Sequence, residues 1–137
     1  MKYFIVFLFL LLVSCSTNPE TYIQHISGYW EIEEVALSNG TKRSYKYNGT
    51  IDYINITDSL TGFRKKVKPN FDGSFSTSND AETITLKIEN NSLIMHYKTE
   101  FSTWKETVLN ASENELRIIN TNKDVYLYKR YHPLNLE

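Results

Sequence analysis

The sequence has a single cysteine, Cys15, among its 137 residues, so the chain cannot form an internal disulfide and its stability must come from packing. Its three histidines, His25, His96 and His132, are far apart, and none lies in a two-histidine motif with metal-ligand spacing. The sequence also lacks a Gly-x-Ser-x-Gly nucleophile motif, a phosphate-binding loop and a calcium-binding loop. We therefore predict neither an enzyme nor a bound metal or cofactor.

An excess of charge of one sign is also missing, because 15 Lys and Arg residues stand against 16 Asp and Glu residues. A balanced chain has no basic field, and this argues against nucleic acid as a partner. Glu31 and Glu33 fall on the strand face opposite Trp30, so we interpret them as a solvated face rather than an acid/base pair. The content of 41% hydrophobic and 14% aromatic residues is typical of a folded protein.

The N-terminus carries the pattern of a secretory signal. Lys2 precedes an apolar run at residues 4–13, which is too short to span a bilayer. The segment 12–15, Leu-Val-Ser-Cys, resembles the bacterial lipoprotein signal, whose cysteine is lipidated and becomes the new N-terminus. This resemblance implies a palmitate-bearing protein that is anchored by the lipid on Cys15 in the cell envelope, with the outer membrane as the expected location. An ordinary secretory signal that contains a cysteine is the alternative.

Removing this signal leaves about 120 residues, which is the size of one domain with a modest core. We divide the chain into a lipoprotein signal peptide at residues 1–14, a lipidated tether with the start of a short helix at 15–24, a barrel domain at 25–132 and a C-terminal tail at 133–137.

A short helix is expected directly after the tether. Asn18 suits the N-cap and Pro19 the first helical position, while Ile23 and Ile26 recur at helical spacing. The pattern predicts one or two turns that end near residue 28. We interpret this helix as a plug over one end of the domain rather than as a partner-binding helix.

From residue 29 onward, runs rich in Tyr, Ile, Val, Thr and Phe alternate with Asn, Gly, Asp and Ser clusters, and this is typical of an all-β protein. We count about eight strands joined by short loops, which predicts an antiparallel up-and-down barrel. A change of apolar parity around Glu33 and Glu34 predicts a bulge in the first strand. An immunoglobulin-like sandwich is the rival fold, less favoured because the second half meanders without a long crossover connection.

Two stretches are less regular. The strand at residues 63–67 carries Arg64, Lys65 and Lys66, which we interpret as a solvated edge face rather than a site for an anionic ligand, because lysine blocks edge pairing. The turn-forming composition of residues 70–80 predicts a loose hairpin or a long loop.

Gly28-Tyr29-Trp30, on the first expected strand after the short helix, resembles the Gly-x-Trp motif of lipocalin-like barrels. Arg130 stands near the end of the last strand, where that family has an arginine that packs over the tryptophan. The resemblance covers roughly residues 26–130 and implies a lipocalin-like barrel closed by Trp30 and Arg130, similar to the small lipocalin-like lipoproteins of Bacteroidetes-type bacteria. The chain is shorter than typical lipocalins, so a large ligand cavity is not expected. The alternative is a core aromatic and a surface cation that do not touch.

Two functions compete on these observations. The first is the binding of a small apolar ligand inside the barrel, with Tyr53, Tyr97, Trp104 and Tyr126 as candidate lining residues. The second is a protein-interaction or structural lipoprotein, an inhibitor or accessory subunit with a packed barrel and no ligand. The expected partners are the membrane, through the lipid on Cys15, and either a small apolar molecule or an envelope protein.

Overall fold

The computed structural model describes residues 18–133. The predicted signal peptide, the lipidation of Cys15 and nearly all of the tail fall outside the described residues and stay predictions. The elements in chain order are α1 (Glu20–Ile26), β1 (Gly28–Ala36), β2 (Lys42–Ser44), β3 (Ile51–Ile56), β4 (Thr61–Pro69), β5 (Phe75–Thr77), β6 (Glu82–Glu89), β7 (Ser92–Lys98), β8 (Thr103–Ala111), β9 (Glu115–Asn120) and β10 (Val125–Arg130).

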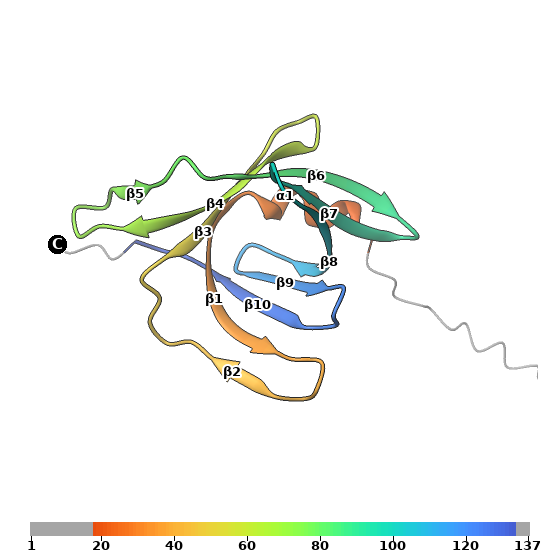
Figure 1. Ribbon diagram of the computed structural model, residues 1–137, viewed down its shortest axis with the longest axis horizontal. Helices are drawn as coiled ribbons and strands as arrows, with labels where there is room; N and C mark the ends of the chain where they lie inside the picture. The colour runs from red at the N-terminus through yellow and green to blue at the C-terminus, as the bar shows by residue number, and fades with distance from the viewer. Residues whose placement is uncertain (1–17, 134–137) are drawn as a thin grey trace, which may run out of the picture.

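Eight of the strands form a closed antiparallel barrel, as the alternation predicted (Figure 1). They follow one another around the barrel in the order β1, β3, β4, β6, β7, β8, β9, β10, and the pairing of β10 with β1 closes it. The short strands β2 and β5 lie outside this ring and pair with β1 and β4. Because neighbours in sequence are neighbours in the ring, the up-and-down prediction is confirmed and the sandwich is wrong.

Strand β1 carries the predicted bulge. Its register against β10 shifts between Ile32 and Glu34. Trp30 before the shift and Val35 after it are both buried, although they stand five positions apart, an odd spacing that would place them on opposite faces of a regular strand. The extra residue restores the inward direction of the second half of the strand, which is how a bulge accommodates a change of apolar parity.

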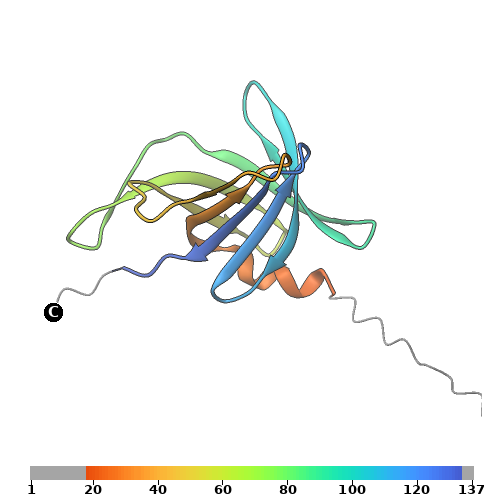
Figure 2. The same ribbon diagram turned by 90° about the horizontal axis from the view of Figure 1, so that it is seen from below.

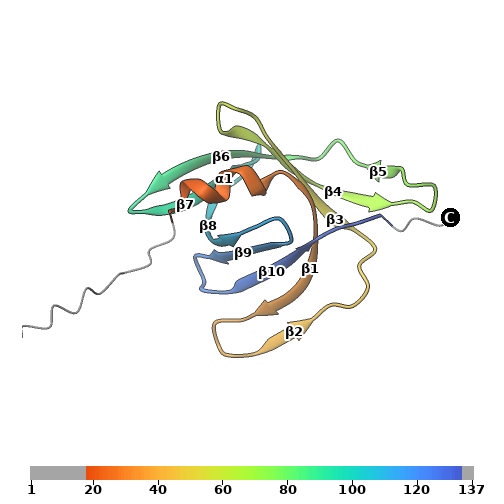
Figure 3. The ribbon, with the colours of Figure 1, turned by 180° about the vertical axis from the view of Figure 1, so that it is seen from behind.

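The helix α1 lies across one end of the barrel, as Figure 3 shows from behind and Figure 2 from below. Asn18 Oδ1 accepts a hydrogen bond from the Glu20 amide at the start of the helix, and Ile26 at its end is fully buried. Tyr22 Oη donates to the Leu109 carbonyl of β8. The helix is therefore the predicted plug, and we name its end of the barrel the closed end.

The turns that join β1 to β2 and β9 to β10 meet at the opposite end, which we name the open end (Figure 2). There the Ser38 amide donates to Asp124 Oδ1. The hydrophobic core occupies the closed end and the middle of the barrel. It consists of residues that alternate inward along the strands, namely Ile26, Trp30, Ile54, Ile84, Leu86, Leu93, Met95, Tyr97, Val108, Ala111, Leu116, Ile118 and Tyr128.

The interpretation of the basic strand as an edge is wrong, although Lys66 and Lys68 are exposed to solvent as that interpretation expected. Strand β4 lies between β3 and β6, so both of its sides are paired over much of its length. Arg64 pairs with Ile54, whose side chain is in the core, and the Arg64 side chain is only 16% exposed. Residues 70–80 contain the short strand β5, which forms a hairpin with the end of β4.

Candidate functional site

The closed end is fastened by Trp30 of β1 and Arg130 of β10, which are paired in register. The Arg130 guanidinium carbon lies 3.7 Å from the centroid of the Trp30 ring. The indole is fully buried, and its Nε1 donates to the Ile26 carbonyl at the end of α1, 2.8 Å away. The tryptophan and the arginine thus contact each other, and the tryptophan holds the helix against the barrel.

Arg130 also joins its own strand to two other segments, the end of α1 and the turn between β8 and β9, by hydrogen bonds. Its Nη1 donates to the Ser27 carbonyl at 2.7 Å, its Nη2 to the His25 carbonyl at 3.0 Å, and its Nε to the Glu113 carbonyl at 2.8 Å. Backbone carbonyls at the end of a short helix carry partial negative charge, which suits a cation. Partial burial lowers the pKa of Arg130.

Gly28 makes room for this arginine. Its φ of +135° lies in a region that side chains disfavour, and a Cβ at this position would overlap Arg130 Nη1. Both named residues of the Gly-x-Trp motif therefore help to place Arg130. Gly28 leaves space for its guanidinium, and the Trp30 ring packs against it.

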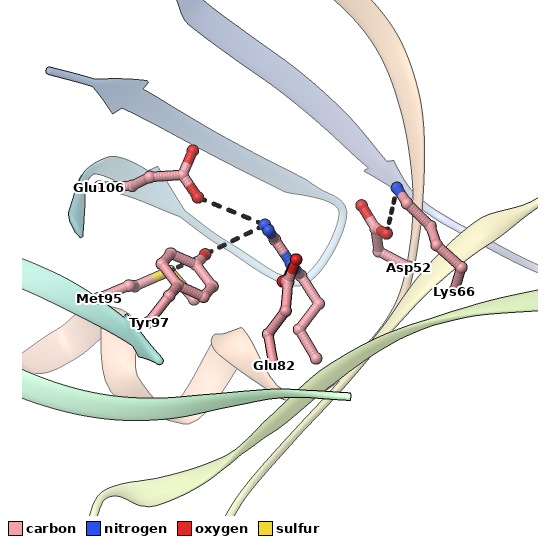
Figure 4. Close-up of polar contacts among 7 residues, drawn as sticks. Asp52, Lys66, Glu82, Met95, Tyr97 and Glu106 are labelled. Atoms are coloured by element: carbon pink, nitrogen blue, oxygen red, sulfur yellow. Dashed lines mark hydrogen bonds and ion pairs between the residues drawn. The ribbon is translucent and has the colours of Figure 1, made fainter. Parts of the chain in front are cut away.

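Polar side chains lie inside the barrel on the side of the hydrophobic core that faces the open end, and Figure 4 shows the contacts among them. We name the five residues Asp52, Arg64, Glu82, Tyr97 and Glu106 the polar layer. Arg64 is at its centre: Nε donates to Glu82 Oε2 at 2.6 Å, and Nη1 donates to Tyr97 Oη at 3.2 Å and to Glu106 Oε1 at 3.3 Å. Five different strands contribute to this layer.

The neighbours of Arg64 stabilise its positive charge. Burial by itself would lower the pKa of Arg64, but Tyr97, the charge and hydrogen bond of Glu82, and the charge of Glu106 outweigh it and raise that pKa. Burial raises the pKa of Tyr97 well above its ordinary value. At neutral pH the layer therefore holds a permanent guanidinium and a neutral phenol.

Asp52 is the other buried acid of the layer. The residue is 3% exposed, and its Oδ1 has no hydrogen-bond donor among the described residues. The Lys66 ammonium lies 2.5 Å from Oδ1 as an ion pair that lacks hydrogen-bond alignment, and the Lys66 side chain is 69% exposed. The carboxylate is thus buried while its cationic partner extends into solvent.

The interior beneath the polar layer is filled. The space among Trp30, Met95, Leu116 and Tyr128 holds no volume that a water molecule can occupy. A barrel of eight strands is just wide enough for its own side chains to fill. The expectation that the barrel has no large cavity therefore agrees with the packing of its core.

Two spaces open above the filled core. The mouth pocket, of about 220 Å³, lies at the open end and is lined mainly by apolar and aromatic side chains, including Ile32, Val35, Tyr45, Asp52, Tyr126 and Tyr128. The side cleft, of about 670 Å³, is lined mainly by polar and charged residues, including Asp52, Arg64, Lys66, Glu82, Thr99 and Phe101. Asp52 lines both spaces.

The four residues proposed to line a ligand site lie in three different places. Tyr97 is buried and stacks on the half-buried Trp104, with ring centroids 5.3 Å apart. Tyr126 lines the mouth pocket. The prediction that Tyr53 lines a ligand site is wrong. Asp52 and Ile54 point into the barrel, and successive side chains of a strand alternate, so Tyr53 between them points outward.

Tyr53 belongs instead to an aromatic cluster on the outer face. The Tyr29 ring stacks on Tyr53 and on Phe75, with centroids 4.6 and 4.5 Å apart. Phe63 packs edge-on against Tyr53, and Tyr131 packs edge-on against Phe75. This outer aromatic cluster covers strands β1, β3, β4 and β5.

Sequence reasoning missed the charged part of the site. Asp52, Arg64, Glu82 and Glu106 were not among the predicted site residues. Glu106 had a usable signal, because it lies between Trp104 and Val108 at the same parity. A carboxylate on an apolar strand face indicates either a functional group or a buried ion pair.

Two kinds of feature are missing from residues 18–133. These residues contain no cluster of three or more His, Cys, Asp or Glu side chains that is able to hold a metal ion. They also contain no helix that is long and apolar enough to cross a membrane.

Comparison with known proteins identifies the fold. A family model described as a lipocalin-like domain matches residues 26–118. A lipocalin-like protein from Bacteroides uniformis ATCC 8492 superposes with a TM-score of 0.50 at 10% identity, covering 78% of this chain and 99% of that one. An uncharacterized protein from Bacteroides eggerthii DSM 20697 gives 0.48 at 11% identity, with 77% and 98% covered. No curated protein matches the sequence. At such identity the first structure shows a shared fold alone.

Proposed function

Because the chain belongs to the lipocalin-like domain family, we propose that it binds a small molecule with an apolar body, held at the open end of the barrel. The observation that carries this proposal is the mouth pocket, whose apolar and aromatic walls come from β1, β10 and the segment after β2. Ligand pockets are concave and mostly apolar with a few polar groups, and Asp52 supplies such a group here.

The volumes limit the ligand. The core beneath the polar layer is filled, so the ligand has only the mouth pocket and the adjoining side cleft to occupy. A volume of about 220 Å³ is smaller than the pockets of roughly 300–1,000 Å³ that hold drug-sized molecules. We therefore propose that the part of the ligand inside the mouth pocket has the size of one aromatic ring or one short alkyl chain.

The experiment has two stages. Native mass spectrometry of the Cys15→Ser protein, purified gently from its host, is expected to show a non-covalent small-molecule adduct. A panel of small apolar compounds is then expected to raise the melting temperature, since a ligand that binds only the folded state stabilises it. Tyr126→Ala removes a wall of the mouth pocket and should reduce the shift, whereas Tyr53→Ala on the outer face should not. A bare protein mass together with no response to the panel would refute ligand binding.

We also propose that the domain is anchored in the cell envelope by a lipid on Cys15, with the outer membrane as its location. The support is the lipoprotein-like segment 12–15. Multiple acyl chains anchor firmly, whereas a single chain binds a membrane only reversibly. Replacing Cys15 with Ser is expected to move the protein from the membrane fraction to the soluble fraction, and unchanged membrane association would contradict the anchor.

The second candidate function is an interaction module, an inhibitor or accessory subunit of an envelope complex. The outer aromatic cluster favours it, together with a neighbouring depression of about 200 Å³ bordered by Phe71, Phe75 and Tyr131. Phe71 is fully exposed. Aromatic residues are enriched at protein interfaces. Affinity capture that depends on Phe71 would support this function, and capture unaffected by Phe71→Ser would count against it.

A further inference from the structure

We propose that the mouth pocket is built for a small organic cation, an amine carried on an apolar body, whose ammonium group binds the carboxylate of Asp52. This assignment rests on the proposed function and names the chemical class of ligand for the same site. Four features of the open end carry it: the burial of Asp52, the cation beside it, the charge balance of the polar layer and the aromatic walls.

Asp52 is a buried acceptor that faces open space. The residue is 3% exposed and lines the mouth pocket, the side cleft and the filled space below them. Its Oδ1 receives no hydrogen bond from the described residues. Buried polar atoms in folded proteins are nearly always hydrogen-bonded, so a carboxylate oxygen at a pocket wall that has an ion-pair partner but no aligned hydrogen bond leaves room for a better-aligned donor from outside the chain.

Lys66 marks the position of that donor. Its ammonium lies 2.5 Å from Asp52 Oδ1, while its side chain is 69% exposed. A lysine held in one exposed conformation loses side-chain entropy, and this entropy is regained when another cation takes its place beside the carboxylate. The ammonium of a ligand is able to replace the lysine because the displaced lysine returns to water at small cost.

The charge balance of the open end also favours a cation. The carboxylates of Asp52, Glu82 and Glu106 face two cations, Arg64 and Lys66. Arg64 is already held by two of these carboxylates, so Asp52 is the acid left for a ligand. An anionic ligand would meet an excess negative charge and would have to compete with Glu82 and Glu106 for Arg64.

The pocket walls suit an amine with an apolar body. Tyr45, Tyr126 and Tyr128 line the pocket around Asp52, together with Ile32 and Val35. The face of an aromatic ring attracts a cation, and this attraction increases when water is excluded. The walls therefore favour the apolar body of the ligand, and Asp52 favours its charge.

Isothermal titration calorimetry on the purified full-length protein tests this with probes of nearly equal size. They are 2-phenylethylamine, 2-phenylethanol and 3-phenylpropanoate, followed by hexylamine and hexanol. The amine of each set is expected to bind about tenfold or more tightly than the alcohol, because the ammonium brings a full positive charge to the carboxylate, whereas the alcohol brings only a neutral donor. The carboxylate is expected to bind most weakly.

Three variants locate the effect. Asp52→Asn keeps the side-chain shape and is expected to weaken amine binding about tenfold or more, and to weaken amine binding more than alcohol binding. Lys66→Met removes the competing ammonium and is expected to strengthen amine binding. Asp58→Asn changes an exposed acid in the turn before β4 and should alter neither. If Asp52→Asn folds poorly, Lys66→Met still tests the proposal, because the Lys66 side chain is exposed.

The outcomes separate the two proposals. Equal binding of amine and alcohol, both reduced by Tyr126→Ala, would overturn the amine assignment and leave the proposed function standing. Amine binding that ignores both Asp52→Asn and Lys66→Met would also overturn it. Failure of every probe, together with no response to the apolar panel, would overturn both proposals.

Discussion

The guanidinium carbon of Arg130 lies 3.7 Å from the ring centroid of Trp30, and the same guanidinium donates hydrogen bonds to backbone carbonyls at the end of α1 and in the turn between β8 and β9. Arg130 therefore connects the first strand, the last strand and the helical plug. Its contribution to the free energy of unfolding comes partly from the contact with Trp30 and partly from the hydrogen bonds to the carbonyls.

A double-mutant cycle separates these two parts. We expect Trp30→Phe and Arg130→Met to lower the free energy of unfolding non-additively, with a coupling of about 0.5–2 kcal/mol, the range of a partly desolvated cation–π contact. Chemical denaturation of the four proteins measures it. Additive losses would show that Arg130 acts through the carbonyls alone.

Gly28→Ala is expected to destabilise the protein by about 1–3 kcal/mol, because the residue has a positive φ and the new Cβ would overlap Arg130 Nη1. Gly73→Ala is the matched control, since Gly73 also has a positive φ but a Cβ added there would meet no atom within 4 Å. Thermal melts of both variants isolate the contact with Arg130. If the two variants lose the same stability, backbone strain alone explains the requirement for glycine at position 28.

Arg64→Met is expected to destabilise the barrel by about 3–5 kcal/mol, because it leaves the carboxylates of Glu82 and Glu106 without their cation at a partly buried site. Arg117→Met breaks an exposed pair with Glu115 and should cost only about 0–1 kcal/mol. Urea denaturation compares them. Adding Glu106→Gln to Arg64→Met should recover part of the loss, and a further loss would contradict this account.

Stability should fall steeply in alkaline solution. Burial raises the pKa of Tyr97 and Tyr128 above the ordinary value of 10.0. A folded-state pKa above the unfolded-state pKa means that the unfolded chain loses its protons first, so the stability from these residues is intact below about pH 10 and declines above it. Melting temperatures between about pH 8 and 11.5 test this. Tyr128→Phe should flatten the decline, and the exposed Tyr47→Phe should not.

The alternation of apolar residues was enough to predict much of the barrel. Leu86 on β6 and Leu93 and Met95 on β7 are buried, and Leu93 and Met95 stand at alternate positions of their strand. These strands are joined by a tight turn, so local sequence determines both their direction and their register.

The polar layer was not predictable in the same way. Arg64 stands in a run, residues 63–68, where basic residues occupy both parities, so the sequence does not show which of them points inward. Its partners Glu82 and Glu106 come from strands that only the closed sheet brings together. The prediction for Tyr53 was wrong because it rested on residue type, whereas the inward direction of the neighbouring Ile54 determines the face on which Tyr53 lies.

The closure of β10 onto β1 has a consequence for folding kinetics. Arg130 reaches the carbonyl of His25, 105 residues earlier in the chain, so the ring cannot close before almost the whole domain has emerged. Contacts of such sequence separation carry a high loop-closure entropy and slow the folding of barrels. Until closure, β1 and β10 each present an unpaired edge to other chains. The residues that speed this last pairing therefore protect the newly made protein from aggregation before any ligand is available to bind.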